Sequence, residues 1–432
     1  MAIRQPKIPD GGLYIGLNSG TSADRIDACL VRAPSSRAGG ERPLRIRLLA
    51  RASAAIPAPL RDLIYAGPDR MSARDLCVLD ARIGERFGVA AARVLSISGV
   101  EPSDVRAIGL HGQTVCHLPA AKGGSCSLQI GSPERVAAIA GIDVVSDFRQ
   151  ADIAAGGEGA PLSPVLDHAL FRGGGGALVL NIGGIANLTA VPASGDRERV
   201  VGLDVGPGNM LLDGLARRWS RGRLGRDEGG GMALRGRVDP TLLARALAYR
   251  PLLSRTTRSL GREEFGEPFL DHFLAGALRP PRAIENLLAT AAAVTAECAW
   301  RAVASTVLPR GGSWGRSLWV CGGGLRNGAI LRELRARFEP RSFAVRPFER
   351  GGVSARDREC VLFAFLAREF LARRPGNIPS VTGATRPVVL GSLSPRPVVL
   401  GSLSPRPVVL GNLSSRPEPA GGHRPPRARK AG

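Results

Sequence analysis

Alternating apolar and polar residues near the N-terminus predict a β-hairpin. The apolar run at 13–15 leads into a bend rich in Gly and Ser, and apolar residues then alternate with polar ones over 26–30. Residues 177–195 follow the same order, with an apolar strand, a bend at Gly183 and Gly184, and a second strand. The chain therefore has two halves that each open on a strand, a glycine bend and a strand.

Helix and strand patterns follow each hairpin. Residues 75–98 place apolar residues at helical spacing, and 105–110 form an apolar strand pattern. In the second half, 284–303 predict a long buried helix, and the strand at 317–321 enters a glycine turn that opens another helix. Two β/α halves predict a bilobal α/β protein. We expect the glycine turns to form the floor of a cleft between the lobes.

Three tandem decamers follow the β/α body. The segment RPVVLGSLSP occurs at 386–395 and again at 396–405, and RPVVLGNLSS follows at 406–415. Each decamer places Pro before a short Val-Val-Leu run, which prevents a helix and buries little surface. We expect lobes at 11–172 and 173–385, followed by a Pro- and Arg-rich tail at 386–432 that is disordered.

The charge balance raises the possibility of a polyanion partner. The 432 residues carry a net charge of +22, but nearly all basic residues are Arg, and Lys occurs only at Lys7, Lys122 and Lys430. Because basic residues are not interleaved with aromatic ones, we expect no nucleic-acid partner. A polyanion-binding protein stays the alternative, which a steep salt dependence of DNA retention would identify.

Cysteine spacing and the apolar segments indicate the compartment. The seven Cys residues contain no C-x-x-C pair, which argues against a zinc site and against a disulfide framework. The first residues have no apolar leader pattern, and no uninterrupted apolar span has transmembrane length. We therefore expect a cytoplasmic protein without a membrane partner.

Glycine-rich turns after apolar strands favour a nucleotide site. Such turns expose backbone N–H groups and allow a phosphate to approach closely. They occur at 19–22, at Gly183 and Gly184, at 206–208 and at 322–324, and Asn209 follows the third as a predicted helix cap. Neither a P-loop pattern nor a dinucleotide fingerprint is present. The pattern predicts a nucleoside triphosphate between the lobes.

Eight segments extend this prediction, in the order SGTSADRID, GLHGQTVCH, LQIG, DFRQADIAAGGEGAPL, LNIGGIANL, GLDVGPGNMLLD, VCGGGLRN and PGNIPSVTGA. Together they resemble the anhydro-N-acetylmuramic acid kinase family of the sugar-kinase/Hsp70/actin superfamily. The resemblance implies two RNase H-like domains around an ATP cleft, and a homodimer. It also implies conversion of 1,6-anhydro-N-acetylmuramic acid to N-acetylmuramic acid 6-phosphate in peptidoglycan recycling, with ATP and Mg²⁺.

For the nucleotide, the resemblance implies contacts from the first hairpin and from the later turns. These residues are Gly20, Thr21, Ser22, Ala23, Asp24, Arg25, Ile26, Asp27, Gly183, Gly184, Gly206, Gly208, Asn209, Gly322, Gly323, Gly324 and Asn327. Asp24 or Asp27 would hold Mg²⁺. The alternative is an ordinary hairpin with Asp24 as a turn residue. The family usually has Leu and Gly where this chain has Ala23 and Arg25.

For the sugar, the resemblance implies contacts from His111 and Gln113. Arg149 fits the lactyl carboxylate because Arg binds carboxylates bidentately, with Asp152 as its orienting partner. The alternatives are a capped core histidine at His111 and a surface ion pair between Arg149 and Asp152. Glu158 replaces the usual Gln of the family.

For catalysis, the resemblance makes Asp204 the general base that takes a proton from the attacking water. Glu359 matches an acidic position near the sugar, while Arg356 replaces one of the usual acids. The alternatives are a helix cap at Asp204 and an exposed first-turn glutamate at Glu359. The departures from the family pattern leave a second hypothesis, a member that binds ATP without turnover.

Overall fold

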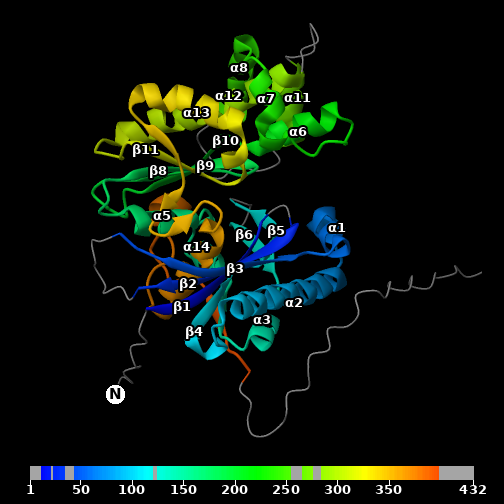
Figure 1. Ribbon diagram of the computed structural model, residues 1–432, viewed down its shortest axis with the longest axis vertical. Helices are drawn as coiled ribbons and strands as arrows, with labels where there is room; N and C mark the ends of the chain where they lie inside the picture. The colour runs from blue at the N-terminus through cyan, green and yellow to red at the C-terminus, as the bar shows by residue number, and fades with distance from the viewer. Residues whose placement is uncertain are drawn as a thin grey trace, which may run out of the picture. The chain divides into compact units, whose positions relative to one another are not determined.

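Two β-sheets with the same strand order organise the chain in its computed structural model (Figure 1). The structure describes residues 11–20, 23–34, 43–119, 124–253, 265–275 and 284–397. The first sheet has the order β15-β7-β4-β1-β2-β3, and the second has the order β10-β9-β8-β11-β12. Numbered along the chain, and leaving β15 aside, both read 3-2-1-4-5. The first three strands are antiparallel and the later ones run parallel, which confirms two RNase H-like sheets.

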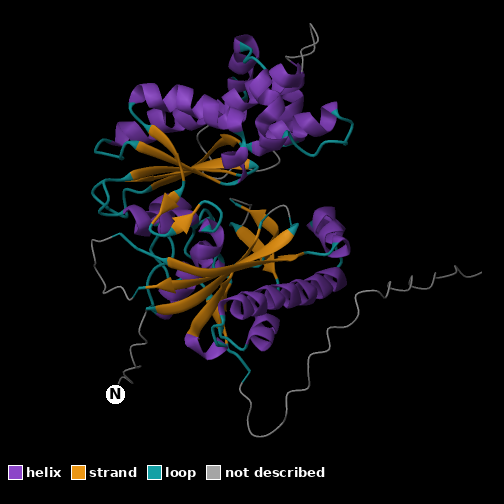
Figure 2. Cartoon of the chain, in the orientation of Figure 1, coloured by secondary structure: helices purple, strands orange, loops and turns teal. Residues whose placement is uncertain are grey.

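The strands alternate with helices along the chain (Figure 2). The first sheet contains β1 (Gly12–Ser19), β2 (Arg25–Ala33), β3 (Arg47–Ala55), β4 (Val105–Leu110), β7 (Val144–Ser146) and β15 (Ser392–Ser394). The second contains β8 (Ala177–Ile182), β9 (Ile185–Val191), β10 (Val201–Pro207), β11 (Ser317–Cys321) and β12 (Ala344–Pro347). Two small hairpins pair β5 (Gln113–Leu118) with β6 (Cys126–Ile130), and β13 (Glu349–Arg350) with β14 (Val353–Ser354).

The described helices are α1 (Ala58–Ala66), α2 (Ala73–Ser98), α3 (Pro133–Ala140), α4 (Gln150–Ala154), α5 (Ser163–Phe171), α6 (Asn209–Trp219), α7 (Gly231–Arg235), α8 (Pro240–Leu247), α9 (Arg250–Leu253), α11 (Glu267–Ala275), α12 (Ile284–Ala302), α13 (Gly328–Phe338), α14 (Arg358–Leu371) and α15 (Pro379–Thr382). Short 3-10 turns are η1 (Pro68–Arg70), η2 (Pro102–Asp104), η3 (Glu228–Gly230), η5 (Leu308–Arg310), η6 (Gly323–Arg326) and η7 (Glu339–Arg341), and η4 (Val303–Val307) is a π turn.

Helix α2 covers one face of the first sheet. It begins at a capping box, in which Ser72 and Asp75 satisfy each other's backbone N–H groups, and it ends at Gly99 in the left-handed region. Its buried face contributes Leu79, Ile83 and Phe87 to a core with strands β1 to β4 and helix α3. The helix predicted at 75–98 is therefore confirmed, and its apolar spacing matches the buried face.

Helix α14 packs on the other face of the first sheet, against β1 and β4. Its residues share one apolar core with α5 and with β8 of the second sheet. A buried ion pair fixes this packing, because the guanidinium of Arg358 donates to both carboxylate oxygens of Asp167, from Nε at 3.0 Å and from Nη2 at 2.5 Å. The expectation of one continuous second lobe at 173–385 is wrong in this respect, since the chain returns to the first sheet at α14.

Helix α12 is the central helix on the second sheet. It packs against α6, α7, α8 and α13 and against β10 (Figure 1). The segment Ile284–Arg310 is long and apolar enough to span a membrane, but 78% of its most apolar window is buried inside the protein. The long buried helix expected at 284–303 is therefore confirmed as a core helix, and its apolar character is explained by this packing.

The first decamer is ordered, whereas the whole tail at 386–432 was expected to be disordered. Its residues Ser392, Leu393 and Ser394 form β15, which pairs antiparallel with β7 at the edge of the first sheet. Leu390 is 1% exposed and belongs to the core around α14. The expectation failed because the edge of β7 offers unpaired backbone groups and a pocket for one Leu, so a short extended segment gains partners there. Residues 398–432 lie outside the described part of the chain.

Candidate active site

The glycine turns of the second sheet contact one another directly. The N–H of Gly208 donates to the carbonyl of Gly184, and the N–H of Asn209 donates to that of Gly183, both at 2.8 Å. A Cβ at Gly208 would lie 2.4 Å from the carbonyl oxygen of Gly183, so this close approach requires glycine. The turn after β8 and the turn after β10 therefore form one unit.

Asn209 binds the neighbouring turn instead of capping its helix. Gly208 is the N-cap of α6, and the Asn209 amide donates to the carbonyls of Ile182 and Gly183, each at 3.1 Å. The predicted cap is wrong because β10 continues through Pro207, which leaves Asn209 as the first helical residue. The side chain therefore holds the start of α6 against the end of β8.

The third turn, Gly322 to Gly324, brings η6 and α13 to the same place. Asn327 caps α13, and its Oδ1 accepts from the N–H groups of Ala329 and Ile330 at 3.0 and 3.1 Å. A Cβ added to Gly323 would lie 3.3 Å from the amide nitrogen of Asn209. The structure thus brings Asn209, Gly323 and Asn327 together, as the nucleotide prediction requires.

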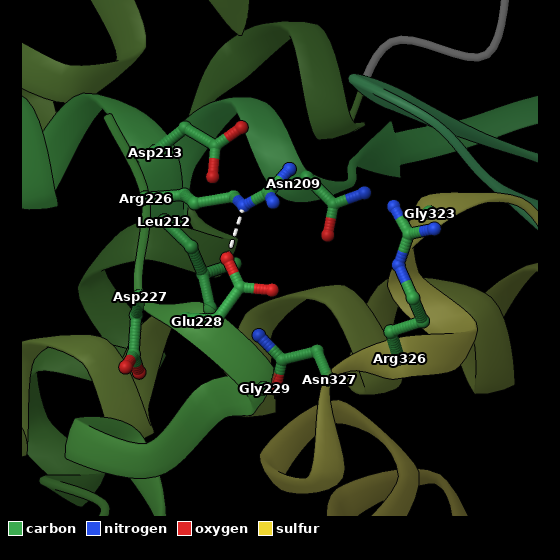
Figure 3. Close-up of a pocket in the computed structure, with 10 residues that line it drawn as sticks. All are labelled: Asn209, Leu212, Asp213, Arg226, Asp227, Glu228, Gly229, Gly323, Arg326 and Asn327. Atoms are coloured by element: carbon green, nitrogen blue, oxygen red, sulfur yellow. Dashed lines mark hydrogen bonds and ion pairs between the residues drawn. The ribbon is translucent and has the colours of Figure 1, made fainter. Parts of the chain in front are cut away.

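These three residues line a pocket of about 480 Å³, measured with its open mouth (Figure 3). The other lining residues come from α6, from the segment before α7 and from η6: Leu212, Asp213, Arg226, Asp227, Glu228, Gly229 and Arg326. Sequence reasoning missed all seven. For 226–229 the available signal was the mixed charges and consecutive glycines at 225–230, because such a segment is a tight, polar turn. Leu212, Asp213 and Arg326 lie within two of the eight segments quoted from the sequence.

Charges of both signs surround this pocket. Asp227 is buried and accepts from the N–H groups of Met232 and Ala233, each at 2.9 Å, so it fixes the segment. Arg226 pairs with Glu228 at 2.6 Å near the pocket (Figure 3). Burial raises the pKa of the Asp213 carboxyl to about 6. The protonation of Asp213 therefore changes near neutral pH.

The β1–β2 hairpin has the predicted tight turn. The N–H of Ala23 donates to the carbonyl of Gly20 at 3.0 Å, while Thr21 and Ser22 lie outside the described residues. The side chains of Ala23 and Ile26 are fully buried, so only their backbone can face a nucleotide. Asp24 is exposed at the turn.

Asp27 is engaged by neighbouring side chains. Its Oδ2 lies 3.3 Å from Nε of Arg25, and its Oδ1 accepts from the Ser53 hydroxyl at 2.5 Å. Among the residues that the structure describes, no group of three or more His, Cys, Asp or Glu has a metal-binding arrangement. By exposure, the Asp24 carboxylate is the more accessible of the two predicted Mg²⁺ ligands, since Asp27 is half-buried.

Hydrogen bonds from β1 connect the hairpin to two further predicted residues. The Ser19 hydroxyl donates to Oε1 of Gln113 at 2.6 Å, and the Asn18 amide donates to Oε2 of Glu359 at 2.7 Å. Glu359 is an exposed first-turn residue of α14. Since Asn18 is 7% exposed, this bond fixes the orientation of a carboxylate that otherwise faces solvent.

His111 and Arg149 form the core of the predicted sugar side. Nη2 of Arg149 lies 3.1 Å from Nε2 of His111, and the His111 ring stacks on Phe363 at a centroid distance of 4.5 Å. Burial and the adjacent Arg149 charge lower the pKa of His111 to about 3. Burial also lowers the pKa of Arg149 to about 10. A neutral imidazole thus accepts from a charged guanidinium.

Two polar atoms of this pair make no well-formed hydrogen bond to the described residues, although the backbone of Gly112 lies near the His111 ring and acts on its pKa. They are Nδ1 of His111 and Nε of Arg149, and both are buried. Because Nε2 accepts from Arg149, the proton of the neutral ring lies on Nδ1. Buried donors without partners are costly, so their presence marks a place where an acceptor-rich ligand fits.

Asp152 is not the orienting partner of Arg149, and that expectation is wrong. Its carboxylate is fully buried and accepts from the N–H of Gly159, the Asn377 amide and the Thr382 hydroxyl, at 2.9, 2.7 and 2.6 Å. Three donors satisfy it in the interior. Asp152 therefore joins the loop after α4 to the segment around α15, and supports the site only indirectly.

Asp204 lies within β10, which continues through Pro207. It stands opposite Asn187 of β9, and the register shifts between Asp204 and Gly206. Such a bulge re-aims the side chains beside it. The side chain is half-buried. Asp204 thus belongs to the second sheet, whereas His111 directly follows β4 of the first.

Comparison of the sequence with known proteins identifies the family. The family model described as anhydro-N-acetylmuramic acid kinase matches residues 12–396. This chain belongs to that family. A relative of the same name from Salinibacter ruber is 39% identical over 388 residues, covering 88% of this chain and 95% of the relative. One from Cupriavidus pinatubonensis is 41% identical over 393 residues, covering 89% and 99%.

One solved structure similar to this member of the anhydro-N-acetylmuramic acid kinase family shares much less of its sequence than these relatives do. The activator of the 2-hydroxyisocaproyl-CoA dehydratase from Clostridium difficile, with bound ADPNP, is 12% identical and has a TM-score of 0.40, covering 83% of this chain and 96% of that one. A TM-score this low does not support an assignment of fold or function. The fold assignment rests on the strand order of the two sheets and on the family match.

Proposed function

We propose that this chain is an ATP- and Mg²⁺-dependent kinase that converts 1,6-anhydro-N-acetylmuramic acid to N-acetylmuramic acid 6-phosphate. The observation that carries the proposal is the family match over 12–396, which includes every predicted site residue from Gly20 to Glu359. The expected setting is cell-wall recycling in the cytoplasm, as a homodimer.

ATP fits the pocket on the second sheet. Its turns bring backbone close to the space between Asn209, Gly323 and Asn327, and Arg226 and Arg326 supply positive charge for phosphate oxygens. Mg²⁺ keeps several waters and takes one or two carboxylates with the substrate phosphates. The exposed Asp24 carboxylate suits that mode. When bound, the ion neutralises the charge that develops on the transferred phosphoryl group.

Arg149 and His111 would bind the sugar. The guanidinium charge suits the lactyl carboxylate, and Nδ1 of His111 supplies a neutral donor. His111 stays neutral over the physiological pH range because its pKa is lowered to about 3. We therefore assign it to binding and orientation, and not to proton transfer.

Asp204 would be the general base. It takes a proton from water as the water oxygen bonds to the anomeric carbon, and the bond from that carbon to O6 breaks. O6 takes the γ-phosphoryl group as the bond to the β-phosphate oxygen breaks and ADP leaves. Glu359, oriented by Asn18, would contact the sugar beside it.

The test is one assay with ATP, Mg²⁺ and 1,6-anhydro-N-acetylmuramic acid, in which sugar phosphate and ADP are measured together. Equal amounts of both, formed only when sugar is present, support the kinase. Nucleotide binding without sugar-dependent ADP release would support the non-catalytic member of the family. When the general base is removed by Asp204→Asn, the matched control is Asp271→Asn. That variant also removes a carboxylate, but Asp271 lies on the surface of α11 and pairs with Arg218.

A further inference from the structure

The hairpin of β5 and β6 (Figure 1) gathers its polar side chains on one face. Thr114 pairs with Gln129, and His117 pairs with Ser127. The register shift that follows Thr114 brings both pairs to the same side of the hairpin. Ser127 is 8% exposed, and the other three are half-buried. We call these four residues the polar row.

The opposite face of the hairpin is apolar and exposed. Leu118 and Leu128 alternate with the polar row along β5 and β6, and they are 49% and 44% exposed. A hairpin with one solvated face usually directs its polar residues into water and its apolar residues inward. This hairpin has the reverse arrangement, which indicates that the polar row serves a binding surface.

The polar row lies beside the residues assigned to the sugar. Strand β5 follows His111 after a single glycine, at the carboxyl end of β4. The Gln150 amide donates to the backbone carbonyl of Ser127 at 2.7 Å, which joins β6 to the start of α4, directly after Arg149. Burial, with the nearby charge of Arg149, lowers the pKa of His117 to about 4. His117 is therefore a neutral imidazole at physiological pH, close to Arg149.

Hydrogen bonds within the polar row leave one atom unused. The Gln129 amide donates to the hydroxyls of Thr114 and Ser127, at 3.2 and 2.8 Å. The Ser127 hydroxyl lies 3.1 Å from Nδ1 of His117 and 3.4 Å from the carbonyl of Cys116, so it donates to the nearer Nδ1. The proton of the neutral ring then lies on Nε2. That atom is buried and has no hydrogen-bond partner among the described residues.

We propose that the polar row binds the acetamido group of the sugar, with Nε2 of His117 donating to the acetamido carbonyl oxygen. This inference rests on the proposed function and names the part of the substrate that the hairpin recognises. The acetamido group stands on C2, next to the carbon that bears the lactyl ether, so a donor beside Arg149 comes within its reach. An analogue without this carbonyl leaves the buried donor unpaired and is therefore discriminated against.

Two substitutions separate the two ring nitrogens of His117. His117→Asn keeps a polar atom near the position of Nδ1 but none at Nε2, whereas the longer amide of His117→Gln reaches the position of Nε2. Titration calorimetry of the full chain with ADP measures binding of 1,6-anhydro-N-acetylmuramic acid and of its 2-hydroxy analogue, in which a hydroxyl replaces the acetamido group. We expect His117→Asn to bind the parent sugar about tenfold more weakly and the analogue as the wild type does. His117→Gln should keep most of the affinity for the parent sugar.

The matched control is His272→Asn, because His272 lies on α11 and contacts the carbonyl of Arg245. Unchanged binding of the parent sugar by His117→Asn would overturn the inference. Equal weakening for the parent sugar and the analogue would overturn the assignment to the acetamido group. Equal losses in the Asn and Gln variants would overturn the role of Nε2. A wild-type chain that binds neither sugar would overturn the proposed function itself, which distinguishes that failure from a failure of the His117 contact alone.

Discussion

Arg149 donates from Nη2 to Nε2 of His111 at 3.1 Å, and burial keeps that histidine neutral. The pair comes from two segments, one after β4 and one after β7, which lie on neighbouring strands of the first sheet. Because the carboxyl ends of parallel strands share one edge, residues 38 positions apart meet there.

This pair gives the stability of the protein a defined pH dependence. The folded-state pKa of His111 is lowered from 6.5 to about 3, so the unfolded chain binds its proton first as pH falls. The stabilisation is present above pH 6.5 and is lost as pH falls through that window toward 3. His111→Gln should reduce the slope of unfolding free energy against pH by up to about 1.4 kcal/mol per pH unit. Urea unfolding at several pH values between about 3 and 6.5 measures this slope in the wild type and in the variant. An unchanged slope would show that His111 is not held neutral by burial.

Arg149→Lys should weaken sugar binding while leaving nucleotide binding intact. Lysine keeps the charge but cannot donate bidentately, and it loses the contact with His111. We expect the KM for 1,6-anhydro-N-acetylmuramic acid to rise by about tenfold to a hundredfold, with the KM for ATP unchanged. Arg86→Lys is the matched control, because Arg86 donates to the carbonyl of Ala55 away from the site. A rise in both constants would place Arg149 outside the sugar side.

Asp213 should make ATP binding depend on pH. Its pKa is raised to about 6, so its carboxylate is charged at about pH 7.5 and protonated at about pH 5. Because a negative charge in the pocket repels phosphates, ATP should bind several-fold more tightly at the lower pH, after correction for ATP's own titration. Asp213→Asn should remove that difference. Titration calorimetry at both pH values measures it, and the same pH dependence in the variant would exclude Asp213 as its source.

The two ends of the decamer region should behave differently on truncation. Stopping after Thr385 removes β15 and the Leu390 anchor, so the melting temperature should fall by several degrees. Stopping after Pro397 keeps the first decamer and should leave the melting temperature within about a degree of the wild type. Calorimetry compares the two, and equal melting would show that β15 adds no stability.

The sequence predicted the parts of the fold that depend on local pattern. Apolar alternation at 26–30 and the glycine bend at Gly183 and Gly184 predicted the two hairpins, and each begins a sheet of the same order. Pattern could not predict that α14 returns to the first sheet, because that packing depends on close contacts with β1 and β4, which are distant in sequence. The order of β15 likewise depends on an edge strand far away in sequence.

In the candidate site, too, local pattern predicted some residues, and others could not be predicted because they depend on residues distant in sequence. Asn209 and Gly323 were predicted from turns, Asn327 was implied by the resemblance to the family, and all three line the pocket, whereas Arg226 stands in no motif and reaches it through tertiary folding. Asp152 was misassigned because its neighbour Arg149 suggested a pair in sequence. Its actual donors come from the loop after α4 and from the segment around α15, which no local pattern places beside it.

Asp204→Asn tests the central claim most directly. The variant keeps the size of the side chain but cannot take a proton from water, and a positioned general base is worth about 10²–10⁴-fold. Because O6 accepts phosphate only as its bond to the anomeric carbon breaks, sugar phosphate formation and ring opening should fall together by at least about a hundredfold, with ATP and sugar still bound. Turnover within about tenfold of the wild type would contradict the assignment of the base. Ring opening without phosphate transfer would contradict the coupled mechanism.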